Sequence, residues 1–104
     1  MKMALKTTDP QIYKLIKAEE KRLREVLEII PSENYISKSV IEALGSILNV
    51  KYSEGFPNKR YYQGNEVIDN VETLTQKRAQ DLFGVPYANV QPYSGSPANF
   101  AVYL

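Results

Sequence analysis

Hydrophobic residues recur at three- and four-residue steps early in the chain, which predicts an amphipathic helix. The helix is expected to begin at Pro10, behind an Asp9 N-cap, and to end near Ile30, because Pro31 cannot continue it. Its apolar stripe consists of Ile12, Leu15, Ile16, Leu23, Val26, Leu27 and Ile30. The charged residues between these positions are interpreted as its solvated face.

A second, shorter helix is predicted over about 39–44, where Ser39 and Glu42 have the spacing of a capping box. Periodicity then disappears over 45–64, a stretch that combines glycine, proline and asparagine with aromatic and charged residues. A long segment without a regular pattern is more often functional than a simple connection. The sequence therefore predicts a functional loop here.

A third helix is predicted from Asn65, its N-cap, to about Phe83, with Gly84 as its stop. Residues 87–90 are a short strand candidate, and 98–104 begin a further helix. The chain would then end inside an apolar helix, with no partner for its strand. A lone strand cannot satisfy its backbone, so we expect a truncated sequence.

The turn between this strand and the last helix contains Ser94, Gly95 and Ser96. Glycine lets the backbone approach a ligand closely, and the unpaired N–H groups of a helix start favour an anion. The two hydroxyl groups add donors, so the turn is compatible with a phosphate site. Many strand-to-helix turns contain serine and glycine, and the turn alone is therefore a weak signal.

The composition argues against several classes of partner and site. The chain has 104 residues, with 13 basic and 12 acidic, so its charge favours neither nucleic acid nor an anionic membrane as a partner. Without cysteine or histidine, the chain lacks thiolate and imidazole metal ligands and the usual general base, and we expect no metal site. Its apolar runs are too short to span a bilayer. A cytoplasmic protein is expected.

Tyrosine is unusually frequent, with eight residues against three phenylalanines and no tryptophan. Four of them, at Tyr52, Tyr61, Tyr62 and Tyr93, stand among polar neighbours. Packing alone would favour phenylalanine or leucine, because a buried phenol must find a hydrogen-bond partner. Half-exposed surface tyrosines and functional tyrosines are both compatible with this pattern.

The chain contains, in this order, the stretches IPSENY, KYSEGFPNKRYYQG and NVQPYSGSPAN. Together, and with this spacing, they resemble the serine hydroxymethyltransferase family. The first is IPSENY at 30–35, where the family usually has alanine for Pro31. The second is KYSEGFPNKRYYQG at 51–64, similar to the family's KYAEGYPG, lysine or arginine, then RYYGG. The third is NVQPYSGSPAN at 89–99, similar to NVQPHSG, serine or alanine, then QAN. The resemblance runs from about Asp9 to Leu104.

The resemblance implies the N-terminal segment of an α/β enzyme of pyridoxal-phosphate fold type I. Residues 1–64 would form an N-terminal arm, short helices and an active-site and dimer loop, and 65–104 the start of the large cofactor domain. This segment is expected to be mostly α-helical, with long loops and one short strand. The family transfers a one-carbon unit between serine and tetrahydrofolate, giving glycine, in a homodimer or tetramer whose active sites are shared between subunits.

The resemblance also implies roles for individual residues. Glu54 and Tyr62 match catalytic positions of the family. The substrate-binding positions are matched by Ser32, Glu54, Tyr61 and Tyr62. Tyr52 matches a residue that reaches the cofactor phosphate of the neighbouring subunit. Ser94, Gly95 and Ser96 match the cofactor's phosphate cup, and Arg60 is interpreted as structural. Without the motifs, Glu54 would be taken for a solvated loop carboxylate, Ser32 for a helix cap, and the tyrosines for satisfied core phenols.

Some positions depart from the family pattern. Asn58 and Gln63 replace glycines, which restricts the backbone of the loop. Tyr93 replaces histidine and Pro97 replaces glutamine beside the phosphate cup. None of these changes removes a side chain to which the resemblance gives a chemical role.

No stretch matches the family's Schiff-base lysine, the aspartate at the pyridine nitrogen, the stacking histidine or the carboxylate-binding arginine. We therefore expect these 104 residues alone neither to bind the cofactor covalently nor to turn over serine. Two alternatives remain open: another fold-type I enzyme, such as a threonine aldolase, and a non-catalytic helical association module. The amphipathic first and third helices favour the association module, because their apolar faces must be covered by another surface.

Overall fold

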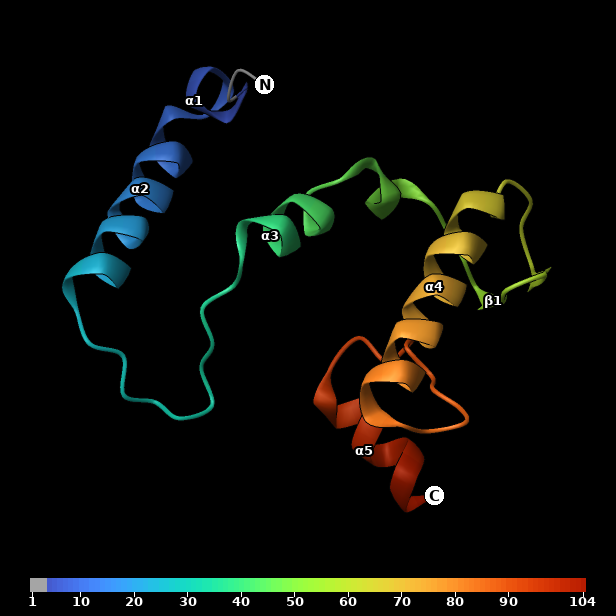
Figure 1. Cartoon of the computed structure of the whole chain (residues 1–104). Coiled ribbons are helices and arrows are strands. Elements are labelled where there is room, and N and C mark those ends of the chain that lie inside the picture. Colours follow the sequence, from blue (N-terminus) through green and yellow to red (C-terminus); the bar gives the residue numbers. More distant parts are fainter. Residues whose placement is uncertain (1–3) are drawn as a thin grey trace. The chain divides into compact units, whose positions relative to one another are not determined.

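The computed structural model describes residues 4–104, and the chain forms two compact units that divide after Lys38. The chain is largely helical, with one small sheet among the described residues (Figure 1). Its elements are α1 (Ala4–Thr8), α2 (Pro10–Glu25), α3 (Lys38–Leu44), a 3₁₀ helix (Ile47–Val50), β1 (Gly55–Phe56), β2 (Lys59–Arg60), α4 (Glu66–Phe83) and α5 (Gly95–Tyr103). The expectation of a mostly helical chain with long loops is confirmed.

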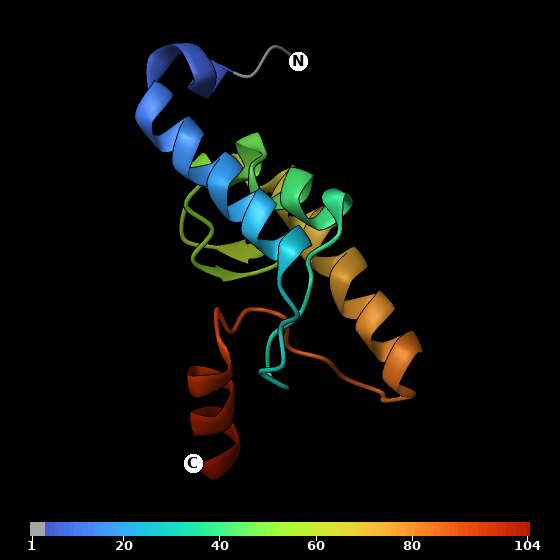
Figure 2. The ribbon, with the colours of Figure 1, turned by 90° about the vertical axis from the view of Figure 1, so that its left-hand side faces the viewer.

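The first unit consists of α1, α2 and the segment that follows them. The N-cap at Asp9 is confirmed, because its carboxylate accepts the Ile12 N–H at 3.0 Å. Pro10 occupies the first turn of α2, and the short helix α1, which the sequence did not predict, joins α2 at a bend (Figure 2).

The predicted end of the first long helix near Ile30 is wrong, because α2 ends at Glu25 and Val26 is extended. The Arg22 guanidinium pairs with Glu19 within the helix and with Glu28 beyond it. Residues six positions apart lie on different sides of an α-helix, so the pair with Glu28 requires the chain to leave the helix first. The hydrophobic periodicity of the sequence continues to Ile30, past the end of α2.

The second unit contains α4, its longest helix. The predicted third helix is confirmed: α4 begins after Asn65 and ends at Gly84, which is left-handed with φ 63°. The predicted second helix is also confirmed, although α3 begins at Lys38, so Ser39 lies inside the helix and not at its N-cap. The last helix begins at Gly95, three residues earlier than expected at Ala98.

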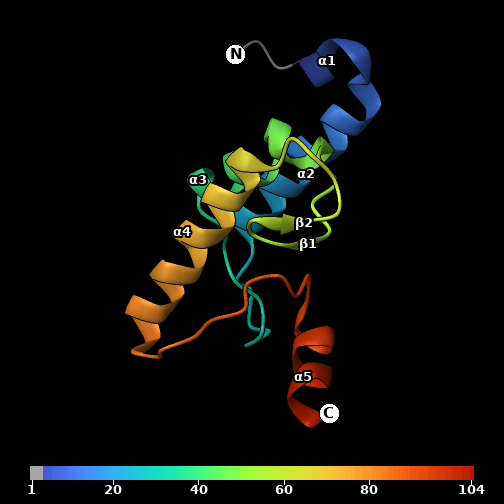
Figure 3. The same ribbon diagram turned by 90° about the vertical axis from the view of Figure 1, so that its right-hand side faces the viewer.

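The expectation of one short strand at 87–90 is wrong. These residues form no strand, and the Asn89 side chain instead accepts the Gln91 N–H at 3.0 Å, a local turn contact. The strands of the described chain are β1 and β2, an antiparallel pair inside the stretch where periodicity disappears (Figure 3). Two-residue strands are too short for an alternating pattern to reveal them.

Hydrophobic side chains are not buried anywhere in residues 4–104. The stripe of α2 illustrates this, with Leu15 65% and Ile16 44% exposed. The one described residue that is buried is polar: Asn65, 4% exposed, at the start of α4. Polar contacts, and not a hydrophobic core, therefore hold the hairpin on α4.

Candidate functional site

The hairpin of β1 and β2 fixes the backbone around Glu54 and Tyr61. Gly55 pairs with Arg60, and the Tyr61 N–H donates to the Glu54 carbonyl at 3.1 Å. The two-residue turn between the strands is Pro57-Asn58, with Asn58 at φ 61°. Proline suits the first central position of such a turn, and asparagine tolerates the left-handed second one. Asn58 thus keeps the conformation that the family's glycine would adopt freely.

Arg60 fastens the hairpin to α4. Its side chain is 4% exposed, and it donates to Asp69 Oδ1 at 2.8 Å and to Glu72 Oε2 at 2.5 Å. It also donates to the carbonyl oxygens of Ser53 and Gly55, at 2.7 and 2.9 Å. A planar guanidinium with five donors can hold four acceptors at once, which a lysine could not do. The structure thus gives Arg60 the contacts of a structural anchor.

Asp69 accepts hydrogen bonds from two parts of the hairpin. The Asn58 N–H donates to its Oδ2 at 2.9 Å, and Arg60 donates to its other oxygen. These contacts, the backbone one first, lower the pKa of Asp69 below its ordinary value. The hydrogen bonds that Arg60 donates to Asp69 and then to Glu72 raise the pKa of the guanidinium. Both groups are therefore charged when the hairpin is attached.

Asn65 holds together the two ends of the segment 52–62, which contains the hairpin. Its amide nitrogen donates to the carbonyl oxygens of Tyr62, at 2.9 Å, and Tyr52, at 3.3 Å. The rings of these two tyrosines lie with centroids 6.4 Å apart and planes tilted by 49°. Sequence reasoning placed Asn65 correctly at the N-cap but missed this role, and its side chain makes no capping hydrogen bond. Its Oδ1 is buried without a partner in the described structure.

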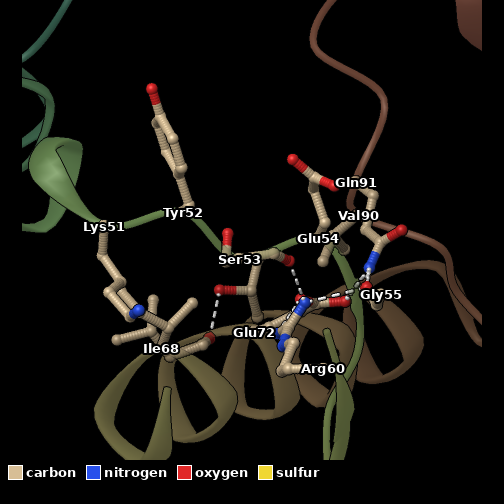
Figure 4. A pocket seen from close by; sticks show the side chains of 12 residues that line it. Lys51, Tyr52, Ser53, Glu54, Gly55, Arg60, Ile68, Glu72, Val90 and Gln91 are labelled. Carbon is tan, nitrogen blue, oxygen red and sulfur yellow. Dashed lines mark hydrogen bonds and ion pairs between the residues drawn. The ribbon is translucent and has the colours of Figure 1, made fainter. Parts of the chain in front are cut away.

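A pocket of about 560 Å³ lies between the loop before the hairpin and α4. It is lined by Lys51, Tyr52, Ser53, Glu54, Gly55, Arg60, Ile68, Val71, Glu72, Thr75, Val90 and Gln91. The Tyr52 ring and the Glu54 carboxylate project away from α4, whereas Arg60, Glu72 and Gln91 form the hydrogen-bonded floor (Figure 4). Tyr62 lines a neighbouring hollow of about 420 Å³ together with Asn65 and Asp69.

The structure brings some of the sequence-predicted residues together. Four of them, Tyr52, Glu54, Tyr61 and Tyr62, lie in or beside the hairpin, and all four are exposed in this chain. Ser32 belongs to the other unit, where it lies in a turn closed by the Glu33 N–H and the Ile30 carbonyl at 3.1 Å. Ser32 is exposed, as a substrate-binding hydroxyl must be before it meets a ligand.

Ser94, Gly95 and Ser96 form the start of α5, with Ser94 extended at the N-cap. All three are exposed, and the Ser94 side chain makes no capping hydrogen bond. The first-turn N–H groups of a helix have no partner within it, so together with the hydroxyls they can bind an anion. They line neither of the two hollows described above, but Gln91, three residues earlier, lines the larger one.

Two other kinds of feature are absent from the described part of the chain. Residues 4–104 contain no group of three or more acidic residues placed to hold a metal ion. None of the helices described is long and apolar enough to cross a membrane.

Comparison with known proteins identifies the family of the chain. The family model of serine hydroxymethyltransferase matches residues 5–104. Among curated relatives, the serine hydroxymethyltransferase of Acidothermus cellulolyticus is 61% identical over 101 residues, which are 97% of this chain and 24% of the relative. That of Sorangium cellulosum is 56% identical over the same shares. The cytosolic serine hydroxymethyltransferase of Oryctolagus cuniculus is 58% identical over 103 residues, 95% of this chain and 21% of the relative.

The match covers the relatives only in part. The chain spans about a quarter of the length of the curated relatives it matches. The activity of those relatives is therefore that of a longer protein, of which a segment similar to this chain forms about a quarter.

Proposed function

Since this chain belongs to the serine hydroxymethyltransferase family, we propose that it supplies one part of the active site of such an enzyme. The enzyme would interconvert serine and glycine, passing the one-carbon unit to or from tetrahydrofolate, with pyridoxal phosphate as cofactor. The observation that carries the proposal is a match over residues 5–104 that includes all three motif stretches. The rest of the site would come from the other three quarters of the family's length.

The start of α5 is the part of this chain that fits the cofactor. Ser94, Gly95 and Ser96 would hold its phosphate through first-turn N–H groups and hydroxyls, which suit a doubly charged anion. Tyr52 would donate its phenol to the phosphate bound by the neighbouring subunit, since it is 75% exposed here. When bound, the cofactor supplies the electron sink at the substrate's α-carbon.

Glu54 is proposed as the group that handles a proton at the substrate hydroxymethyl group. Its backbone is held by Tyr61 and its carboxylate projects from the pocket, away from the Arg60 anchor (Figure 4). Covering this face would take the carboxylate out of bulk water and place it against the substrate, as a group that transfers a proton requires. Tyr62, with Tyr61 beside it, would orient the same substrate hydroxyl, and Ser32 would contact the amino acid near its carboxylate.

The assembly is part of the same proposal. Residues 1–64 would form the arm and the shared loop, and 65–104 would begin the large cofactor domain. The enzyme would be a homodimer or tetramer, because a tyrosine that serves the neighbouring site has no use in an isolated subunit. We propose a cytoplasmic location, which agrees with the name of the Oryctolagus cuniculus relative.

The test measures glycine formation from serine by the full-length protein that carries this chain, with and without tetrahydrofolate. The proposal requires turnover that depends on tetrahydrofolate. Cleavage of threonine or serine at a rate indifferent to tetrahydrofolate would favour an aldolase instead. Absence of any activity with bound cofactor would reject both. The 104-residue chain alone is expected to be inactive, because it spans about a quarter of the length of its relatives and none of its motif stretches resembles the family's cofactor-binding lysine motif.

A further inference from the structure

One side chain joins the two segments to which the proposed function gives the chemistry. Gln91 precedes the start of α5 by a few residues, and its amide nitrogen donates to the Gly55 carbonyl at 2.8 Å. The same nitrogen donates to Glu72 Oε1, also at 2.8 Å. The first bond spans 36 positions in sequence and the second 19, so both are tertiary contacts.

Gln91 and Arg60 share their acceptors. Arg60 also donates to the Gly55 carbonyl, at 2.9 Å, and to the other oxygen of Glu72. The four groups therefore form a closed ring of hydrogen bonds on the floor of the pocket (Figure 4). The side chains of Glu72 and Arg60 are 12% and 4% exposed, so water competes weakly for the bonds between them, whereas Gln91 is exposed and closes the ring from the solvent side.

The residues of the ring lie next in sequence to residues with proposed chemical roles. Gly55 directly follows Glu54, and Arg60 directly precedes Tyr61 and Tyr62. Gln91 lies on the segment that leads to Ser94. If Gln91 moves, the Gly55 carbonyl to which it is bonded moves with it, and so does the backbone beside Glu54.

Resting on the proposed function, we propose that Gln91 is a positioning residue that sets the distance between the Glu54 loop and the phosphate-binding turn. Its amide has two donor hydrogens, and each meets one acceptor of the ring. Neither a methionine, which has no donor, nor a glutamate can replace it. A glutamate would place a second carboxylate against Glu72 and a negative oxygen against the Gly55 carbonyl.

The test compares the full-length wild-type protein with Gln91→Met and Gln91→Glu. We expect kcat per bound cofactor to fall about tenfold in Gln91→Met, the effect of about one net hydrogen bond, and further in Gln91→Glu. Dividing by bound cofactor removes any loss of folded protein, so a merely structural role would leave this number unchanged. Gln76→Met is the matched control, because Gln76 contacts the same Glu72 oxygen at 3.4 Å but has no bond to the hairpin.

A second readout does not depend on turnover. Amide hydrogen exchange over residues 53–62 should be about tenfold faster in Gln91→Met than in wild type or Gln76→Met, while α4 keeps its protection. If wild type turns over no serine, the proposed function fails, and exchange alone still decides whether Gln91 holds the loop. If wild type is active but Gln91→Met matches it in kcat per bound cofactor and in exchange, the positioning role is overturned.

Discussion

At the scale of single residues, the chain separates side chains that hold the loop from side chains that are free to act. The Arg60 side chain is 4% exposed, and both it and the buried Asn65 bond to backbone carbonyls, whereas Glu54 and Tyr52 project from the pocket (Figure 4). The anchors fix the backbone on both sides of the exposed residues. A group that is itself unconstrained by ion pairs but mounted on a fixed backbone is well suited to meet a substrate.

Replacing Glu54 tests the chemical side of this division. In the full-length enzyme, Glu54→Gln should lower kcat for serine with tetrahydrofolate by about 100-fold or more, because the amide cannot exchange the proton. Bound cofactor and unfolding temperature should stay unchanged, since the side chain is exposed. The control is Glu25→Gln, a surface glutamate whose pair with Lys21 spans 3.7 Å. Wild-type activity in Glu54→Gln would remove Glu54 from the mechanism.

At the scale of elements, the hairpin and the C-terminus of α4 both depend on glycines with positive φ. A Cβ on Gly55, at φ 98°, would lie 2.4 Å from the Lys59 carbonyl oxygen, so the hairpin could not close. Gly84, at φ 63°, has nothing within 4 Å of that position. Conformational strain is common to both sites, but the steric clash belongs to the hairpin alone.

Alanine substitutions therefore have different expected costs. Gly84→Ala should destabilise the full-length protein by about 1 kcal/mol, the cost of a left-handed alanine. Gly55→Ala should cost about 2 kcal/mol or more, because strained backbone and a backbone clash are added together. Chemical denaturation of both variants measures the difference. Equal losses would mean that the hairpin is not closed as described.

The attachment of the hairpin to α4 should depend on pH. The pKa of Asp69 is lowered, chiefly by the Asn58 N–H and then by Arg60. A carboxyl group with a lowered folded-state pKa stabilises the fold above its unfolded value of about 3.9 and loses that contribution as the pH falls through the folded-state pKa. The stability difference between wild type and Asp69→Asn should thus be present at pH 7 and shrink below about pH 4. A difference that is constant with pH would contradict the pairing.

How far the sequence predicted these elements depends on what ends each one. Gly84 ended α4 as expected, because a left-handed glycine cap is a local signal. The end of α2 at Glu25 was missed because hydrophobic residues continue at helical spacing to Ile30, and the hairpin was missed because its strands are two residues long. The motif stretches singled out Glu54 and the tyrosines as candidates, but they could not predict the ring through Gln91, because its partners are 19 and 36 positions away.

At the scale of the whole molecule, the chain is a set of well-formed elements without a hydrophobic core among residues 4–104. The apolar stripe of α2 and side chains such as Leu74, 49% exposed, and Phe83, 73% exposed, lie open. Under the proposed function, the neighbouring subunit and the rest of the family's fold cover these faces. Burial of apolar area is the main favourable term in folding, so the isolated chain lacks most of it.

The 104-residue chain by itself should accordingly lack a cooperative thermal transition. Helices that form locally and separately melt over a broad temperature range, because each depends on its own hydrogen bonds. Circular dichroism with differential scanning calorimetry measures this. A sharp transition with an enthalpy near that of a domain of about 100 residues, about 60–80 kcal/mol, would show that the chain folds without any covering surface.

The fate of the serine hydroxymethyl carbon tests the central claim most directly. The full-length protein is given serine labelled at its hydroxymethyl carbon, pyridoxal phosphate and tetrahydrofolate, and the products are followed by nuclear magnetic resonance. The proposed function predicts glycine and labelled methylenetetrahydrofolate in equal amounts. Unchanged serine in the presence of bound cofactor, or labelled formaldehyde released equally with and without tetrahydrofolate, would contradict it.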